Sequence, residues 1–136
     1  MLNNFKYNLK NPSIFRGVFC LCLYLISATS FSQAIIKVKD TKKNFGFVKK
    51  GETVSIKYDV ENSGNEPLLI SNYKVECSCT TVTLPSAPIL PKMKGEIIVN
   101  FDTKTVYDRQ DRIVEIISNA KNGTIKVRFK GVVLSK

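Results

Sequence analysis

The chain is organised around residues 62–84, NSGNEPLLISNYKVECSCTTVTL. This stretch opens with the turn NSGN, whose residue types tolerate positive φ angles. Pro67 follows at the first position of a strand, where its missing N–H breaks no ladder hydrogen bond. The stretch then places Cys77 and Cys79 between two strand-like runs. These features predict a crossover between two strand-rich halves of a β-sandwich.

Apolar and polar residues alternate with a period of two on both sides of this stretch, as they do in strands with one buried face. Residues 53–60 show the clearest alternation, and residues 95–101 and the C-terminal segment repeat it. Residues 33–40 predict an edge strand whose lysines oppose pairing with neighbouring molecules. Asn122 and Gly123 mark a hairpin turn before the last strand.

Other parts of the chain carry weaker strand signals. Residues 44–48 predict a short strand whose two aromatic residues, Phe45 and Phe47, both face the core. Residues 102–111 are polar and predict a loop. Residues 112–118 predict a strand with apolar cover on both faces.

After residue 32, no segment shows a helical period. About seven to nine short strands with turn signals between them are typical of an all-β fold, an immunoglobulin-like antiparallel β-sandwich. An up-and-down barrel is the alternative, because the same alternation also fits a closed sheet. The sequence therefore predicts one sandwich domain over residues 33–136.

Residues 1–32 have the composition of a secretory signal peptide. Three basic residues and no acidic residue accompany the apolar run VFCLCLYLI, residues 18–26. Small residues at the end of the segment predict cleavage between Ser32 and Gln33. The apolar part is shorter than the about 20 residues of a membrane-spanning helix. We therefore expect an exported protein, periplasmic or extracellular, with no transmembrane segment after cleavage.

The composition narrows the available chemistry. The absence of histidine excludes Ser-His-Asp and Cys-His catalysis and histidine-ligated zinc or copper. A pair of carboxylates can hydrolyse glycosides, but the candidate pair, Asp108 with Asp111, falls in the predicted loop with no aromatic sugar platform nearby. We therefore expect no enzymatic activity and no cofactor.

The chain is basic, with 21 basic and 11 acidic residues. Removal of residues 1–32 takes away three basic residues, which leaves 18 − 11 = +7. The basic residues that predict a common surface are Lys37, Lys39, Lys42, Lys43, Lys49 and Lys50, with Lys126, Arg128 and Lys130 on the outer face of the last strand. One interpretation is a solvated surface that opposes aggregation, and the other is attraction to an anionic component of the cell envelope. The sequence contains no nucleic-acid recognition motif, so nucleic acid is not an expected partner.

Cys77 and Cys79 are the cysteines that remain once residues 1–32 are removed, in a compartment that favours oxidation. In a regular strand the Cα atoms of residues i and i+2 lie about 6.6 Å apart. A bridge between them therefore requires a tight backbone turn at Ser78. Several interpretations stay open: a structural pair, oxidised or reduced; two thiolates that bind Cu(I); a redox-active pair; or an intermolecular cross-link.

The order of several short motifs resembles a known family. The motifs are Phe45-Gly46, Gly51-Glu52, Asn62-Ser63-Gly64 with Pro67-Leu68, Cys77-Ser78-Cys79-Thr80, Pro91, Gly95, Phe101-Asp102, Ser118-Asn119 and Gly131-Val132. The series is similar to the family called domain of unknown function 1573, secreted bacterial proteins with an immunoglobulin-like sandwich similar to those of major sperm protein, Hydin and the pilus chaperones. The chain departs from the family in having Glu76 and Ser78 where serine and glycine are usual. The resemblance implies the sandwich fold and no established enzymatic activity.

We therefore expect an exported, non-enzymatic binding or structural protein of the bacterial cell envelope. It is expected to act through the surface of the sandwich, or through an edge strand to which an extended partner segment adds. The expected partner is an unidentified protein or an anionic envelope component. The alternative is a Cu(I)-binding or thiol-redox protein that uses Cys77 and Cys79.

Overall fold

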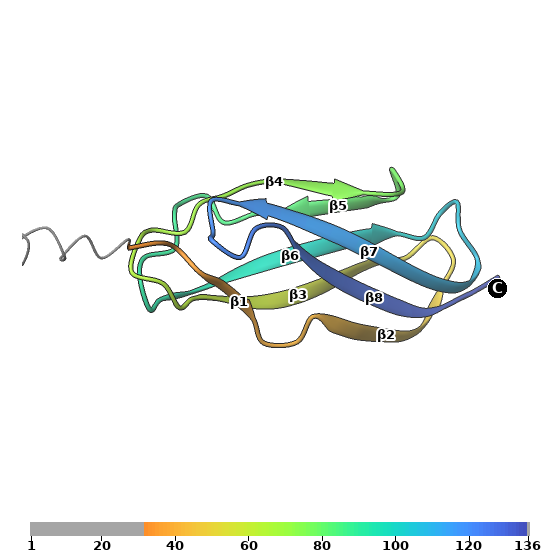
Figure 1. Cartoon of the computed structure of the whole chain (residues 1–136). Helices are drawn as coiled ribbons and strands as arrows, with labels where there is room; N and C mark the ends of the chain where they lie inside the picture. The colour runs from red at the N-terminus through yellow and green to blue at the C-terminus, as the bar shows by residue number, and fades with distance from the viewer. Residues whose placement is uncertain (1–31, 136) are drawn as a thin grey trace, which may run out of the picture. The chain divides into compact units, whose positions relative to one another are not determined.

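The computed structural model describes residues 32–135, which form two β-sheets packed face to face (Figure 1). The strands are β1 Ile36–Val38, β2 Lys42–Lys49, β3 Thr53–Asn62, β4 Ile70–Val75, β5 Thr80–Thr83, β6 Lys94–Asp102, β7 Asp108–Ser118 and β8 Ile125–Leu134. Eight strands, with no helix among residues 32–135, confirm the predicted all-β sandwich. The predicted signal peptide, except for Ser32, lies outside the described residues.

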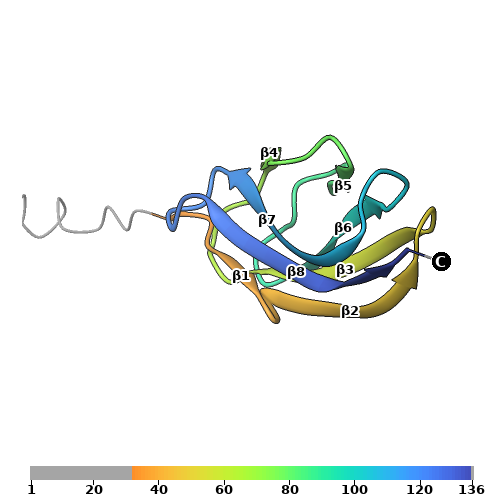
Figure 2. The same cartoon turned by 90° about the vertical axis from the view of Figure 1, so that its right-hand side faces the viewer.

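The two sheets have four strands each, in the orders β1-β3-β6-β5 and β2-β8-β7-β4. Neighbouring strands run antiparallel except that β2 lies parallel to β8, a pairing that the prediction of an antiparallel sandwich did not include. The turn after β2 carries the chain from the second sheet into the first. As a result β2 lies beside the last strand instead of forming a hairpin with β3. Figure 2 shows β2 beside β8 at one margin of the sandwich, with β4 and β5 at the opposite margin.

The core lies between the inner faces of the two sheets. The alternation predicted for β3, β6 and β8 is confirmed, because their inward side chains are buried. Rings of Phe45, Phe101 and Phe129 form a cluster with centroids 5.2–6.3 Å apart. Gly131 leaves space for this cluster, because a Cβ atom there would lie 2.3 Å from a ring carbon of Phe45.

Tyr58 on β3 links the first sheet to the second. Its hydroxyl donates a hydrogen bond to the carbonyl oxygen of Arg128 on β8, at 3.0 Å. The side chain is fully buried, and this burial raises the pKa of Tyr58 to about 12. The hydroxyl therefore stays protonated and able to donate throughout the neutral range.

The side chain of Asn62, at the end of β3, bonds to four backbone groups in three chain segments. Its Nδ2 donates to the carbonyls of Glu66 and Ile89, at 2.7 and 2.9 Å. Its Oδ1 accepts from the N–H groups of Gly64 and Ile35, at 3.0 and 3.4 Å. Asn62 is fully buried, so this amide supplies partners to backbone groups from which water is excluded.

Gly64 serves close packing and not a positive φ angle. The residue types of the NSGN turn tolerate positive φ angles, but the turn does not use them: within residues 32–135, positive φ angles occur at Gly46, Gly51, Lys92, Asp108 and Gly123. A Cβ atom on Gly64 would lie 2.2 Å from the carbonyl oxygen of Gln33. The same carbonyl accepts the N–H of Asn65 at 3.1 Å, which holds the two segments together.

A bulge in β2 changes the direction of its side chains. The register with β8 shifts between Asn44 and Gly46, where φ is 75°. Phe45 packs against the core as predicted, but Phe47 is 75% exposed. The prediction that both aromatics face the core is therefore wrong for Phe47, because the extra residue interrupts the two-residue alternation.

β7 also differs from its prediction. It begins at Asp108, so the predicted loop over residues 102–111 is shortened to a connection over residues 103–107. The polar residues at the start of β7 form a strand because their backbone groups pair with β8, and this pairing does not depend on their side chains. The predicted apolar cover on both faces of the strand is wrong, because Ile113 is 37% exposed on the outer face.

We predict that Asn62→Asp lowers the free energy of unfolding by about 3 kcal/mol or more, because a carboxylate cannot donate to the two buried carbonyls and carries a buried charge. Urea unfolding followed by circular dichroism measures the change. The matched control is Asn72→Asp on the exposed face of β4, which we expect to change stability by less than about 0.5 kcal/mol. Equal losses in the two variants would contradict the role assigned to Asn62.

Candidate functional site

The Cys-x-Cys pair forms a closed turn between β4 and β5. A disulfide joins Cys77 to Cys79, and their Cα atoms are 5.1 Å apart. The N–H of Thr80 donates to the carbonyl of Cys77 at 3.1 Å, and the N–H of Cys79 donates to Cys77 Sγ, also at 3.1 Å. The tight turn at Ser78 that a bridge requires is therefore present.

This turn carries the chain from one sheet to the other. β4 belongs to the sheet of β7 and β8, and β5 to the sheet of β3 and β6. The carbonyl of Cys79 accepts the N–H of Asp102 at 2.8 Å, which begins the pairing of β5 with β6. Both cysteines are half-buried. The arrangement fits the structural interpretation of the pair, an oxidised cross-link at a crossover between sheets.

The oxidised pair has no thiolate with which to bind Cu(I) or attack another disulfide. Both of those interpretations begin with reduction of the Cys77–Cys79 bond. They stay predictions.

Edge strands expose unpaired backbone groups, and the edge of β1 is capped by another part of the chain. The side chain of Asn122 accepts the N–H of Ile36 at 3.1 Å and donates to the carbonyl of Ile36 at 2.7 Å. The N–H of Lys121 also donates to the carbonyl of Ala34 at 2.9 Å. The turn between β7 and β8 therefore covers this edge.

The edges of β2 and β4 are protected in a different way. β2 carries three lysines and the bulge described above. β4 carries Lys74 and a register shift between Ile70 and Asn72. Charged side chains and irregular register both oppose the addition of another strand.

Among the edge strands of the described chain, β5 differs because its edge has no cap, no charged side chain and no irregular register. Its residues, TTVT, are uncharged and pair with β6 in unbroken register. Because the carbonyl of Cys79 faces β6, the antiparallel pattern directs the backbone groups of Thr81 and Thr83 toward β6 as well. The carbonyl of Thr80 and both backbone groups of Val82 therefore point to the open edge.

The basic residues predicted to form one surface are divided between the two sheets. Lys37 and Lys39 lie exposed on and beside β1, in the first sheet. Lys42, Arg128 and Lys130 lie exposed on the second sheet, where Lys42 is the strand partner of Arg128. The fold therefore makes two separate basic regions.

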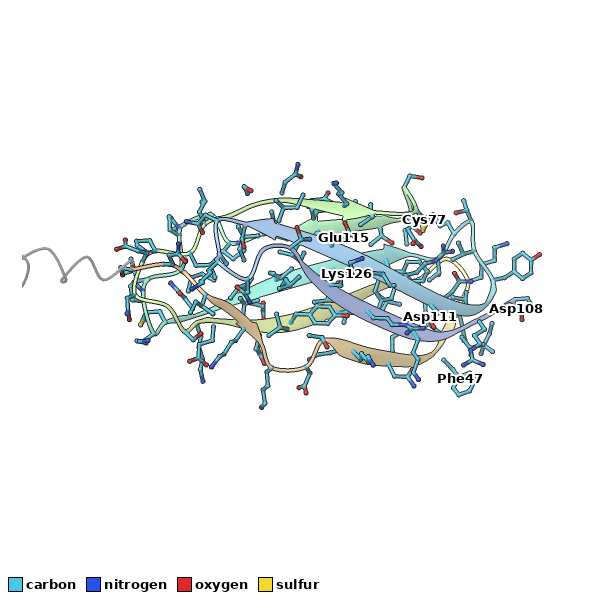
Figure 3. The ribbon with its side chains drawn as sticks, viewed as in Figure 1. Phe47, Cys77, Asp108, Asp111, Glu115 and Lys126 are labelled. Atoms are coloured by element: carbon cyan, nitrogen blue, oxygen red, sulfur yellow. A yellow bond between two sulfur atoms is a disulfide. The ribbon has the colours of Figure 1, made fainter. Side chains whose placement is uncertain are left out.

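Ion pairs neutralise part of the outer face of the second sheet (Figure 3). Lys126 Nζ lies 2.9 Å from Glu115 Oε1. The guanidinium of Arg128 donates from two nitrogens to the carboxylate of Asp111. These hydrogen bonds hold the pKa of Asp111 below its ordinary value.

Asp108 and Asp111 do not converge on a common point. They are three residues apart in β7, and Figure 3 shows Asp108 at the end of the strand, away from Asp111. Arg128 also keeps Asp111 ionised, which is unsuitable for a general acid. The pair therefore lacks the arrangement of a glycosidase site.

The described residues hold neither a metal cluster nor a membrane span. Among residues 32–135, no three side chains of cysteine, aspartate or glutamate gather closely enough to hold a metal ion. In the same part of the chain, no helix has the length and apolar character needed to cross a membrane.

Sequence reasoning missed the open edge of β5 and the cap on β1. A usable signal for the first was present, because no charged residue occurs between Cys77 and Pro91. The cap had no such signal, since Asn122 lies 86 residues from Ile36 and was assigned only to the hairpin turn.

The family described as Protein of unknown function (DUF1573) matches residues 36–133, nearly all of the described chain. No curated protein matches the sequence.

Solved structures with similar folds include a protein of unknown function from Porphyromonas gingivalis W83. Its TM-score is 0.67 at 16% identity, and the match covers 79% of this chain and 50% of that chain. This chain thus spans about half the length of that protein. The ASH / PapD-like domain of human CEP192 has a TM-score of 0.58 at 10% identity, and the match covers 76% of this chain and 88% of that domain's chain. The secreted serine protease VesC from Vibrio cholerae has a TM-score of 0.53 at 13% identity, and the match covers 73% of this chain and 23% of the protease chain. At these identities the likeness shows the fold alone.

We predict that replacing both Cys77 and Cys79 with serine lowers the free energy of unfolding by about 1–2 kcal/mol, because a bridge over so short a loop restricts the unfolded chain only slightly. Urea unfolding of the variant and of the reduced wild-type protein should give the same value. A variant that keeps the fold and stability of the oxidised protein but loses its biological role would instead favour the copper or redox interpretation.

Proposed function

This chain belongs to the family described as Protein of unknown function (DUF1573), and we propose that it is an exported, non-enzymatic binding protein of the bacterial cell envelope. It binds an extended segment of another protein as an additional strand beside β5. The observation that carries the proposal is the open, uncharged edge of β5, next to three edges that are capped, charged or irregular.

The backbone of β5 supplies the affinity in this mode of binding. The N–H and C=O of Val82 and the C=O of Thr80 are directed to the edge, as the pairing of β5 with β6 requires. A partner strand would satisfy these groups with its own main chain.

The side chains around β5 define the kind of segment that fits. Val82 and Leu84 are half-buried and pack against the core, so alternate apolar side chains of a partner strand would extend the core beside them. Thr81 and Thr83 are exposed, so the other side chains of the partner meet a polar, uncharged surface. The proposal therefore specifies an extended segment of alternating apolar and polar residues.

The export part of the proposal rests on other observations. The composition of residues 1–32 is that of a signal peptide, and a disulfide such as Cys77–Cys79 is typical of an oxidising compartment. The lack of histidine supports a binding role over a catalytic one.

We predict that Val82→Pro weakens partner binding by about tenfold or more, because proline removes the outward N–H and its ring obstructs the approaching strand. The N–H of Val82 takes no part in pairing with β6, so the fold should persist. The measurement is quantitative mass spectrometry of proteins captured from the cell envelope by tagged wild-type and variant chains. The amount of at least one captured protein should fall by about tenfold or more. This is the change in affinity expected when a backbone contact worth about 1.4 kcal/mol is lost.

The matched control is Val82→Ala, which removes the two side-chain methyl groups but keeps the N–H. It should capture the same proteins as the wild type. Capture of the same set by the Val82→Pro variant would overturn the proposed edge interaction.

We also predict that exported protein begins at Gln33, because the small residues before it form a cleavage site. Intact mass spectrometry of material purified from the periplasm or medium measures the N-terminus. Exported material that retains Met1 would contradict the signal-peptide interpretation.

A further inference from the structure

The outer face of the second sheet contains a basic groove that the proposed strand addition does not use. The groove has a volume of about 440 Å³ and is formed by side chains of β2, β7 and β8. Five basic side chains and one carboxylate line it, so its formal charge is 5 − 1 = +4. A concave region with this charge attracts anions more strongly than scattered surface lysines do.

Four of these five cations take part in no ion pair within the described chain, and one of the four, Lys43, lies with its Nζ 5.7 Å from the centroid of the Tyr58 ring, which leaves three for a ligand. The single carboxylate, Asp111, is occupied by the guanidinium of Arg128. None of the ion pairs found among residues 32–135 includes Lys42, Arg109 or Lys130. The groove therefore holds unneutralised positive charge around a fixed Arg128.

The strand register brings these cations to one place. Lys42 is the partner of Arg128 across β2 and β8, and Asp111 is the partner of Lys130 across β7 and β8. Neighbouring strands lie about 4.8 Å apart, within reach of long side chains that share a face. Lys130 and Arg109 also contribute to lowering the pKa of Asp111, as cations facing the same carboxylate must.

A second hollow, lined in part by apolar side chains, adjoins the basic groove. This hollow, of about 240 Å³, shares Asn44, Arg109 and Lys130 with the groove and continues over Phe47 and Val132. The bulge in β2 leaves the ring of Phe47 75% exposed, and Figure 3 shows it standing clear of the ribbon. The site thus combines a cluster of cations with an open aromatic face.

From this combination we propose that the groove binds a phosphorylated sugar. The phosphate lies among Lys42, Arg109 and Lys130, where its several oxygens accept charge-assisted hydrogen bonds. The apolar face of the sugar ring packs on Phe47. Concentrated charge around one point favours a phosphate over the single charges spread along an acidic peptide.

Single-stranded nucleic acid fits the groove less well. Binding of that kind uses several aromatic side chains, on which successive bases stack. Within the described face, the two adjoining hollows offer one aromatic ring, that of Phe47. The site therefore matches one phosphate and one ring.

The test is a titration of the purified, isotope-labelled protein with glucose 1-phosphate, inorganic phosphate and glucose, followed by NMR chemical shifts at fixed ionic strength. The triple variant Lys42→Gln, Arg109→Gln, Lys130→Gln should weaken binding of glucose 1-phosphate by about tenfold or more. The matched control removes the same charge from the first sheet, with Lys37→Gln, Lys39→Gln and Lys94→Gln. It should change the affinity by less than about twofold, since screening limits distant charges.

Phe47→Ala separates the two halves of the site. It should weaken binding of glucose 1-phosphate by about threefold or more, because the ring contact is lost, and leave binding of inorganic phosphate unchanged. Phe47 is exposed, so this variant stays informative even if the triple variant fails to fold.

Equal losses in the two triple variants would overturn the proposal in favour of non-specific charge attraction. Tighter binding of oligothymidylate than of glucose 1-phosphate would assign the groove to nucleic acid, and tighter binding of tetraglutamate would assign it to acidic peptide. Either result would overturn the proposal. Val82→Pro should leave the sugar-phosphate affinity unchanged, so failure of the strand-addition proposal and failure of this one are distinguishable.

Discussion

The buried amide of Asn62 is the interaction on which the rest of this sandwich depends. One side chain accepts from the backbone near the start of β1 and donates to the crossover after β3 and to the segment before β6. Each of these backbone groups is removed from water and needs a partner, so the amide holds three chain segments in one arrangement. Its hold on Ile35 also places β1 where Asn122 can cap it.

The four edges of the two sheets are protected unequally, and the cap on β1 is the part that depends on this arrangement. Once β1 is capped by a turn of the other sheet, and β2 and β4 carry lysines and irregular register, β5 is the regular and uncharged edge among the described strands. An unprotected edge is a hazard for an isolated protein, because it can pair with any extended chain. In a binding protein the same feature gives a place for a partner, and the Cys77–Cys79 turn determines where that edge begins.

The two proposed binding regions belong to different sheets and use different physics. β5 lies at the margin of the first sheet and offers backbone hydrogen bonds, which select a partner segment in an extended conformation. The groove lies on the outer face of the second sheet and offers charge, which is sensitive to ionic strength. The groove also depends on an irregularity, since the bulge at Gly46 turns Phe47 outward beside the cations. A regular β2 would have placed that ring in the core and left a surface of charge alone.

Local residue patterns were enough to predict the sandwich and the buried faces of β3, β6 and β8, because burial of one strand face imposes a period of two. The turn residues before β4 and the Cys-x-Cys pair after it likewise marked the crossover between the sheets. The sequence also placed the lysines that protect β2. The parallel pairing of β2 with β8, the cap of Asn122 on Ile36 and the grouping of Lys42, Arg109 and Lys130 became visible in the folded chain alone. Each of these brings together residues far apart in the chain, and their contact depends on strand order and register, which no local pattern of residues encodes.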